Sequence, residues 1–78
     1  MPIRPEACRA ARALMGWSMR DLARRAGVSL GAVNRLEGGD VAARETTTAK
    51  VEAAFSGSGV RIIDGELETG AVLSRRGG

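Results

Sequence analysis

Five residues near the middle of the chain carry groups that could contact the edges of DNA bases from one face of a helix. The carboxamide of Asn34 can pair with N6 and N7 of adenine, and the guanidinium of Arg35 can pair with O6 and N7 of guanine. Leu30 can offer an apolar contact, most plausibly to a thymine methyl group. The hydroxyl of Ser29, at the expected start of the helix, could hold a phosphate together with free backbone N–H groups.

Gly31 is the fifth member of this set, and it has two explanations. Glycine inside a helix costs about 1 kcal/mol relative to alanine. Close approach of the helix backbone to DNA would justify that cost, whereas a surface position under little selection would also tolerate it. The sequence favours neither. The expected base-contacting residues are therefore Ser29, Leu30, Gly31, Asn34 and Arg35.

Several arginines outside this set are candidates for contacts to DNA phosphates. Arg20 and Arg24 point away from the expected core on the preceding helix, and Arg44 lies in the loop that follows. Contacts of this kind position a protein on DNA without reading its sequence. Arg25 is expected instead to pair with Asp21, four residues earlier.

Three charged residues have less specific expectations. Arg9 and Arg12, on the first expected helix, allow either phosphate contact or plain solvation. Glu37 lies beyond the contact face, where solvation or an intrahelical partner is favoured.

The chain offers little for catalysis or metal binding. It has no His and no Tyr, and its only cysteine, Cys8, falls among apolar residues at helical spacing. A lone cysteine cannot form an internal disulfide, so a small buried helix residue is the favoured interpretation. The sequence contains no Ser/His/Asp set, phosphate-binding loop or metal-ligand cluster. We therefore expect no catalytic residue, no metal site, no cofactor and no enzymatic activity.

Two short helices must position the base-contacting residues, and the segment from Met19 to Gly38 (MRDLARRAGVSLGAVNRLEG) has the spacing that they need. Ala23 falls where the second helix leaves no room for a longer side chain. Gly27 falls at the turn, where a positive φ is required and glycine adopts it without strain. The expected inward residues are Leu22, Ala26, Val28, Val33 and Leu36. This agreement is typical of a DNA-binding helix-turn-helix.

Capping signals place the earlier helices. Pro5 suits the first turn of a helix that Gly16 ends, and Ser18 with Asp21 predicts a capping box for the next helix. Trp17, the only tryptophan, is interpreted as structural, with stacking on a nucleobase as the alternative. The first helix is expected to direct inward Ala7, Cys8, Ala11, Leu14 and Met15.

Similar signals place the later helices. Ser29 predicts the N-cap of the third helix, and Gly38 with Gly39 ends it. A loop over residues 40–45 follows, and Thr46 or Thr47 opens a fourth helix that the break at residues 56–59 ends. That helix is expected to direct inward Val51, Ala54 and Phe55.

The tail changes from helical to extended periodicity. Residues 60–64 are rich in β-branched side chains, residues 65–70 are turn material, and residues 71–74 could pair back. The pattern predicts a β-hairpin, which must pack on the helices or pair with a second copy, since an isolated hairpin is marginal in water. The expected dimerisation residues are Val60, Ile62, Ile63, Val72 and Leu73.

Composition and charge set the broad class. The 78 residues suit one small domain with a small core, which dimerisation would help to stabilise. The net charge is +3, but residues 1–35 carry seven arginines against only Glu6 and Asp21, which suits a polyanion. No apolar run approaches a membrane span, and the N-terminus lacks the apolar region of a signal peptide. A cytoplasmic, nucleoid-associated protein is therefore expected.

The segment GWSMRDLARRAGVSLGAVNRLEGG resembles the helix-turn-helix core of the XRE family, which includes Cro and the lambda-type repressors. The resemblance implies a compact, mainly α, four-helix domain, dimers on inverted-repeat operators, and transcriptional control, usually repression. It implies that the five residues at 29–31, 34 and 35 face the bases and that Arg20 and Arg44 meet phosphates. Met19 departs from the pattern, because the family often has a glutamine there that binds a phosphate and braces the recognition helix.

Two functions from different classes follow from these features. The favoured one is a bacterial or phage regulator that binds double-stranded DNA as a homodimer, with residues 29–37 as its recognition helix. Residues 1–57 would form the DNA-binding domain, and residues 58–78 a C-terminal β arm. The alternative is a protein-interaction module, such as an antitoxin or accessory subunit, whose hairpin binds a second protein.

Overall fold

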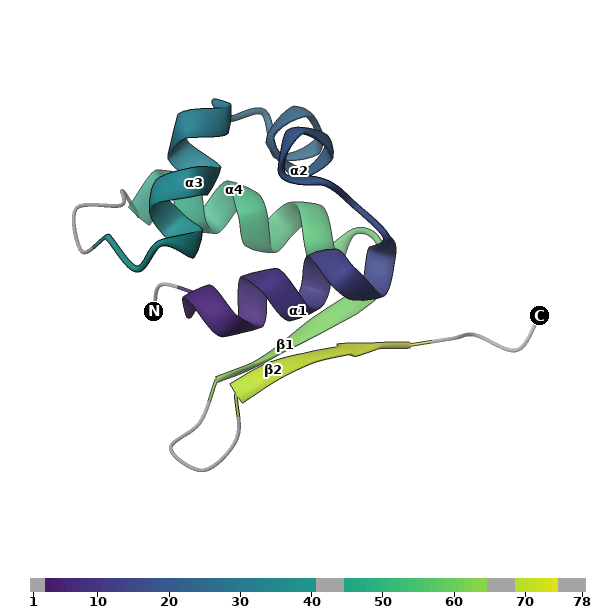
Figure 1. The fold of residues 1–78 in the computed structure, drawn as a ribbon. Helices are drawn as coiled ribbons and strands as arrows, with labels where there is room; N and C mark the ends of the chain where they lie inside the picture. Colours follow the sequence, from purple (N-terminus) through teal and green to yellow (C-terminus); the bar gives the residue numbers. More distant parts are fainter. Residues whose placement is uncertain (1–2, 41–44, 65–68, 75–78) are drawn as a thin grey trace.

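A computed structural model describes residues 3–40, 45–64 and 69–74. Within these residues the chain forms α1 (Pro5–Met15), α2 (Met19–Ala26), α3 (Leu30–Glu37) and α4 (Glu45–Ser56), followed by β1 (Val60–Asp64) and β2 (Thr69–Leu73). Figure 1 shows α2 and α3 on one side of α1 and α4, and the hairpin on the other side. The predicted mainly helical domain with a C-terminal β-hairpin is therefore confirmed.

The core lies between the four helices and extends to the inner face of the hairpin, which packs on α1 and α4. Its largest fully buried side chains include Phe55, Leu22, Val33 and Val51. Trp17 is also buried and stacks on Phe55, with 5.5 Å between ring centroids and 14° between planes. Offset aromatic pairs of this kind add about 1 kcal/mol beyond the area that they bury. The structural interpretation of Trp17 is thus confirmed.

Local sequence determines where the first two helices begin and end. Gly16 and Gly27 follow α1 and α2 with left-handed φ angles of 68° and 71°, as predicted. The Ser18 Oγ accepts the N–H of Asp21 at 3.0 Å, and the Asp21 carboxylate accepts the N–H of Ser18 at 2.9 Å. The predicted capping box is therefore present, and it sets the start of α2 directly after the turn.

Two expected boundaries were wrong by about two residues. Helix α4 begins at Glu45 rather than at Thr46 or Thr47, because a carboxylate in the first turn is stabilised by the positive end of the helix. Strand β2 begins at Thr69 rather than at residue 71, since its pairing with β1 extends through Gly70 and Thr69. The other predicted turn residues, 65–68, lie outside the described residues.

One predicted core residue of α1 is exposed. The buried stripe of this helix runs through Ala7, Cys8 and Ala11 and continues to the half-buried Met15. Leu14 lies beside that stripe and is 43% exposed. Helical spacing alone placed it inward, but the second half of the helix turns this position toward solvent.

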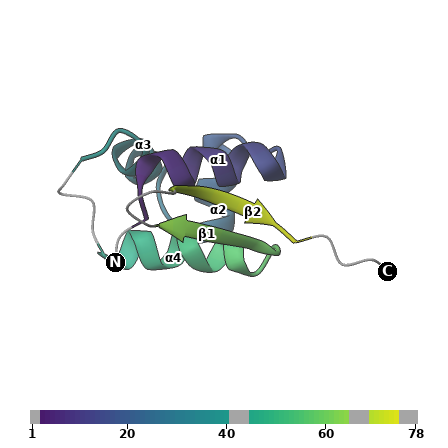
Figure 2. The ribbon, with the colours of Figure 1, turned by 90° about the horizontal axis from the view of Figure 1, so that it is seen from below.

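The hairpin packs on the helices with one face and turns its other face away from them. Figure 2, which is seen from the side of the hairpin, shows both strands in front of α1 and α4. Val60 is buried, and Ile62, Ala71 and Leu73 pack against the same core. Val72 pairs with Arg61 on the opposite face and is 36% exposed. The predicted requirement that the hairpin pack on the helices is therefore met within one chain.

None of the helices in the described part of the chain is long and apolar enough to cross a membrane.

Candidate nucleic-acid interface

Helix α3 presents a face that is separate from its core-facing side. Val33 and Leu36 are buried, so the helix is anchored by one stripe. The remaining positions of interest are all exposed, and they are Ser29, Leu30, Gly31, Asn34 and Arg35. The structure thus brings the five predicted base-contacting residues to one surface.

The two long polar side chains of this face, those of Asn34 and Arg35, are available for new partners. Asn34 and Arg35 use their backbone carbonyl groups to accept the N–H groups of Gly38 and Asp40 at the end of the helix. Their side chains make no hydrogen bond or ion pair with any other residue in the described ranges. A ligand could therefore engage both side chains without first breaking an internal contact.

Ser29 is occupied in part by the fold. Its Oγ accepts the N–H of Ala32 at 3.0 Å, as expected for an N-cap. The cap fixes the start of α3 one residue after Ser29. Leu30 and Gly31 are the first two helical residues, and the N–H groups at such positions have no acceptor inside a helix.

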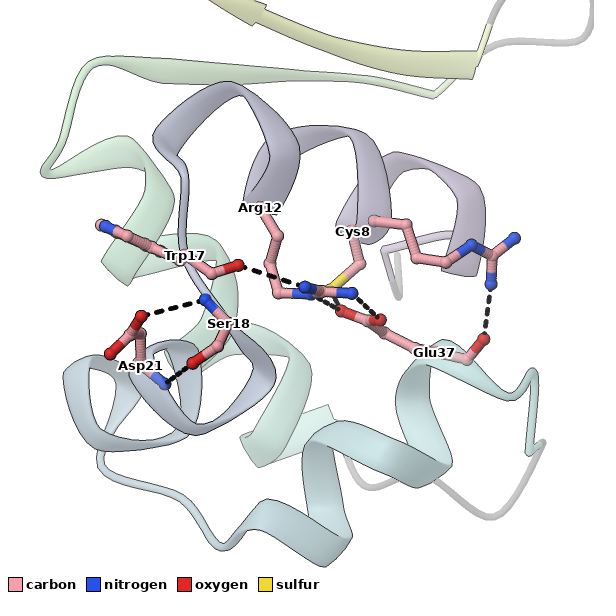
Figure 3. Close-up of polar contacts among 7 residues, drawn as sticks. Cys8, Arg12, Trp17, Ser18, Asp21 and Glu37 are labelled. Atoms are coloured by element: carbon pink, nitrogen blue, oxygen red, sulfur yellow. Dashed lines mark hydrogen bonds and ion pairs between the residues drawn. The ribbon is translucent and has the colours of Figure 1, made fainter.

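A polar network that the sequence did not predict holds the other end of α3. Glu37 was expected to be solvated or paired within its own helix, but it is 8% exposed and points at α1 (Figure 3). Its carboxylate accepts the Nε and Nη2 of Arg12 at 2.6 and 2.8 Å. The Nη1 of Arg12 donates a further hydrogen bond to the carbonyl oxygen of Trp17 at 3.1 Å. Of the two open alternatives for Arg12, plain solvation is therefore wrong, and its guanidinium is engaged inside the protein.

Two more groups of α1 complete this network. Arg9 remains exposed but donates from Nη1 to the backbone carbonyl of Glu37 at 2.7 Å, so of its two open alternatives plain solvation does not hold. The Cys8 thiol donates to Glu37 Oε2 at 3.2 Å. Burial, and then the hydrogen bond to Glu37, raises the pKa of this thiol above its ordinary value. Cys8 is thus a protonated, buried helix residue, as predicted.

The network has a clear structural consequence. The hydrogen bond to Glu37 raises the pKa of the Arg12 guanidinium, which therefore stays charged. A bidentate pair fixes geometry as well as distance. Together with the Arg9 contact to the backbone, it ties the last turn of α3 to α1. The buried Val33 and Leu36 anchor the core-facing side of α3. The Arg12–Glu37 pair fixes the orientation of the helix relative to α1.

The arginines of α2 differ from one another in their contacts. Arg20 is exposed, and its side chain has no partner among the described residues. Arg24 has a 75% exposed side chain and forms an ion pair with Asp21 at 2.9 Å. Arg25 was expected to be that partner, but its guanidinium lies 4.6 Å over the Trp17 ring. The expectation for Arg25 was wrong because the buried indole lies within its reach and offers a cation–π contact.

Two other positions complete the account of the predicted site. Arg44 lies outside the described residues. Met19, which takes the place of the family's frequent glutamine, is half-buried and packs against the core. Its contribution to this region is therefore apolar contact.

Comparison with known families agrees with this geometry. A model of a helix-turn-helix domain of the XRE type matches residues 9–59. The matched span includes all of α2, α3 and α4 and most of α1, and it ends just before β1. The chain has no match among curated proteins.

Proposed function

The chain belongs to the XRE-type helix-turn-helix family, whose domains bind DNA and are not enzymes, and on this premise we propose that it is a sequence-specific transcriptional repressor. In the proposed complex α3 enters the major groove of double-stranded DNA, with its N-terminal residues at the base edges. The observation that carries this proposal is the exposed face of α3, where Asn34 and Arg35 have no competing partner among the described residues.

The proposed contacts have distinct roles. Asn34 and Arg35 read adenine and guanine, Leu30 packs on a thymine methyl group, and Ser29 and Gly31 bring the start of α3 against the groove. Arg20, Arg24 and Arg44 grip phosphates and set the register of the protein on the duplex. Because Arg24 already has Asp21 as a partner, Arg20 is the stronger contributor of the two from α2.

We further propose that two copies bind an inverted repeat, with half-sites about 10–10.5 bp apart or a multiple of that spacing. The position of the hairpin restricts how the two copies can meet. A two-fold axis lies in the plane of the interface that it creates. Since the hairpin and the α2–α3 pair lie on opposite sides of α1 and α4 (Figure 1), a dimer through the outer face of the hairpin would direct the two α3 helices apart.

Pairing of two hairpins through a strand edge avoids this problem. The two-fold axis of such a dimer is perpendicular to the sheet, so both α3 helices lie on the same side of the joined sheet. Gly59 accepts the N–H of Ser74 at 3.0 Å, so by alternation the backbone groups of Ala71 and Leu73 point away from β1. Both residues are only half-buried, whereas Val60 on the β1 edge is buried. The proposed dimer therefore pairs β2 with β2 of the second copy, at residues 71–73.

The placement of the predicted dimerisation residues supports this edge contact. Leu73 lies in the paired segment itself, and Val60 and Ile62 contribute indirectly, by fixing the hairpin on the core. Ile63 and Val72 lie on the opposite face of the sheet. In this proposal residues 1–57 form the DNA-binding part and residues 58–78 the arm that joins two copies.

One observation favours a second candidate function. Val72 is 36% exposed on the face of the hairpin that is directed away from α3. A second protein bound there would leave the DNA-binding face open, as in an antitoxin or an accessory subunit. Analytical ultracentrifugation of the Ala71→Pro and Val72→Thr variants separates the two. Edge pairing predicts that proline abolishes the dimer while threonine, which removes only the apolar surface, leaves it intact.

The main experiment is selection of duplexes from a random-sequence pool by the wild-type protein, followed by mobility-shift titration at several salt concentrations. The proposal predicts an enriched inverted repeat and affinity that falls steeply with salt, because phosphate contacts release counterions. Recovery of no preferred sequence would overturn it.

A further inference from the structure

Gly31 occupies a position where the fold has no need for glycine. It is the second residue of α3 and has an ordinary helical backbone. A Cβ built on it would meet a single nearby atom, the Ser29 Oγ at 3.9 Å, which is ordinary van der Waals contact. Alanine would therefore fit without strain and has the better helix propensity. Neither packing nor φ explains why the side chain is absent.

The neighbours of Gly31 on the helix surface point to an explanation. Asn34 and Arg35 follow it by three and four residues, so all three lie on one face of α3. Helical side chains lean toward the N-terminus, and each covers the surface one turn before its own Cα. The surface over Gly31 is thus the area that Asn34 and Arg35 cover. A side chain at position 31 would occupy the same space.

We propose that Gly31 is a specificity-determining position, at which the missing side chain forms the notch that admits the edges of the bases. The notch lets the α3 backbone approach the major groove closely. It also leaves room for Asn34 and Arg35 to lie along the helix and reach adjacent base pairs. This inference rests on the proposed DNA-binding role of α3. Of the two explanations for Gly31, it takes close approach of the helix backbone to DNA over a surface position under little selection.

The exposure of Leu30 is consistent with such a notch. Leu30 is 36% exposed and lies directly before the glycine, so the helix presents an apolar side chain next to a position with none. A thymine methyl group beside Leu30 would place the adjoining base edge over Gly31. Substitution at position 31 therefore affects base reading, while phosphate contacts from α2 remain.

The test uses Gly31→Ala and Gly31→Leu, two residues with good helix propensity, and the full chain. Each variant is titrated with a duplex that the wild-type protein selects from a random pool and with an unrelated duplex of equal length. Affinity for the selected duplex is expected to fall about tenfold for alanine, within the range of one lost bidentate pair, and further for leucine. Affinity for the unrelated duplex and the melting temperature are expected not to fall.

Ala53→Leu is the matched control. Ala53 is an exposed helical residue of α4, outside both the proposed DNA-binding face and the hairpin arm. This variant is expected to bind both duplexes like the wild type. An alanine at position 31 that leaves affinity for the selected duplex unchanged, or that weakens both duplexes equally, would overturn the inference. If the wild-type protein selects no duplex, the proposed function itself fails, and this inference falls with it.

Discussion

The guanidinium of Arg12 holds the carboxylate of Glu37 through two hydrogen bonds of 2.6 and 2.8 Å, and the pair joins α1 to the last turn of α3. The side chain of Glu37 is only 6% exposed and that of Arg12 only 20%. The orientation of the proposed recognition helix therefore depends on a charged contact as well as on the buried Val33 and Leu36.

Removal of either partner should strongly destabilise the fold. Glu37→Ala leaves the Arg12 guanidinium half-enclosed without its carboxylate, and breaking a buried pair in this way costs about 3 kcal/mol or more. Urea unfolding followed by circular dichroism measures the loss. The double variant Arg12→Met/Glu37→Leu should lose less than Glu37→Ala, because no uncompensated charge remains. Single variants with wild-type stability would contradict this role.

The capping box of α2 should make stability depend on pH in the acid range. Hydrogen bonds from the backbone and side chain of Ser18 lower the pKa of the Asp21 carboxyl in the folded protein. A carboxyl with a lowered folded pKa stabilises the fold above its unfolded pKa, about 3.9, and this stabilisation is lost as pH falls through the folded pKa.

Asp21→Asn should therefore melt at a lower temperature than the wild type at neutral pH, and the difference should shrink as the solution is acidified. Thermal melts of both proteins over the acid range check this. Glu52→Gln, in the middle of α4, controls for general charge effects. A difference that stays constant down to strongly acid solution would mean that the carboxylate form does not act through the cap.

The two exposed arginines of α2 should weaken DNA binding unequally. Arg20 has no competing partner in the described residues, whereas Arg24 is paired with Asp21 at 2.9 Å. Arg20→Ala should lower affinity for every duplex alike and reduce the salt slope by about one, with a smaller effect from Arg24→Ala. Titrations at several salt concentrations measure both slopes. Equal effects from the two variants would show that the Asp21 pair does not compete with phosphate.

Much of the fold was predictable because it depends on residues close in sequence. The capping box spans Ser18 to Asp21, and the glycine at position 27 sits directly after its helix. The inward residues of α2 and α3 repeat at helical spacing. Each of these features needs only local periodicity and the conformational freedom of glycine.

The contacts between distant residues were not predictable in the same way. Arg12 and Glu37 are 25 residues apart, and periodicity does not tell which charged residue of one helix meets which residue of another. A signal was present, since Glu37 directly follows the buried Leu36 and is four residues after Val33. Similarly, the side-chain alternation of the hairpin separates Val60 and Ile62 from Ile63, but the β-branched composition alone grouped them together.

The central claim is that α3 reads bases, and Arg35→Ala tests it most directly. The measurement is the ratio of affinities for the selected duplex and an unrelated duplex, with Arg20→Ala measured in parallel. Base reading by α3 predicts that Arg35→Ala lowers this ratio about tenfold, which corresponds to about 1.4 kcal/mol of lost discrimination, and that Arg20→Ala leaves it unchanged. A ratio that Arg35→Ala does not alter would contradict the account.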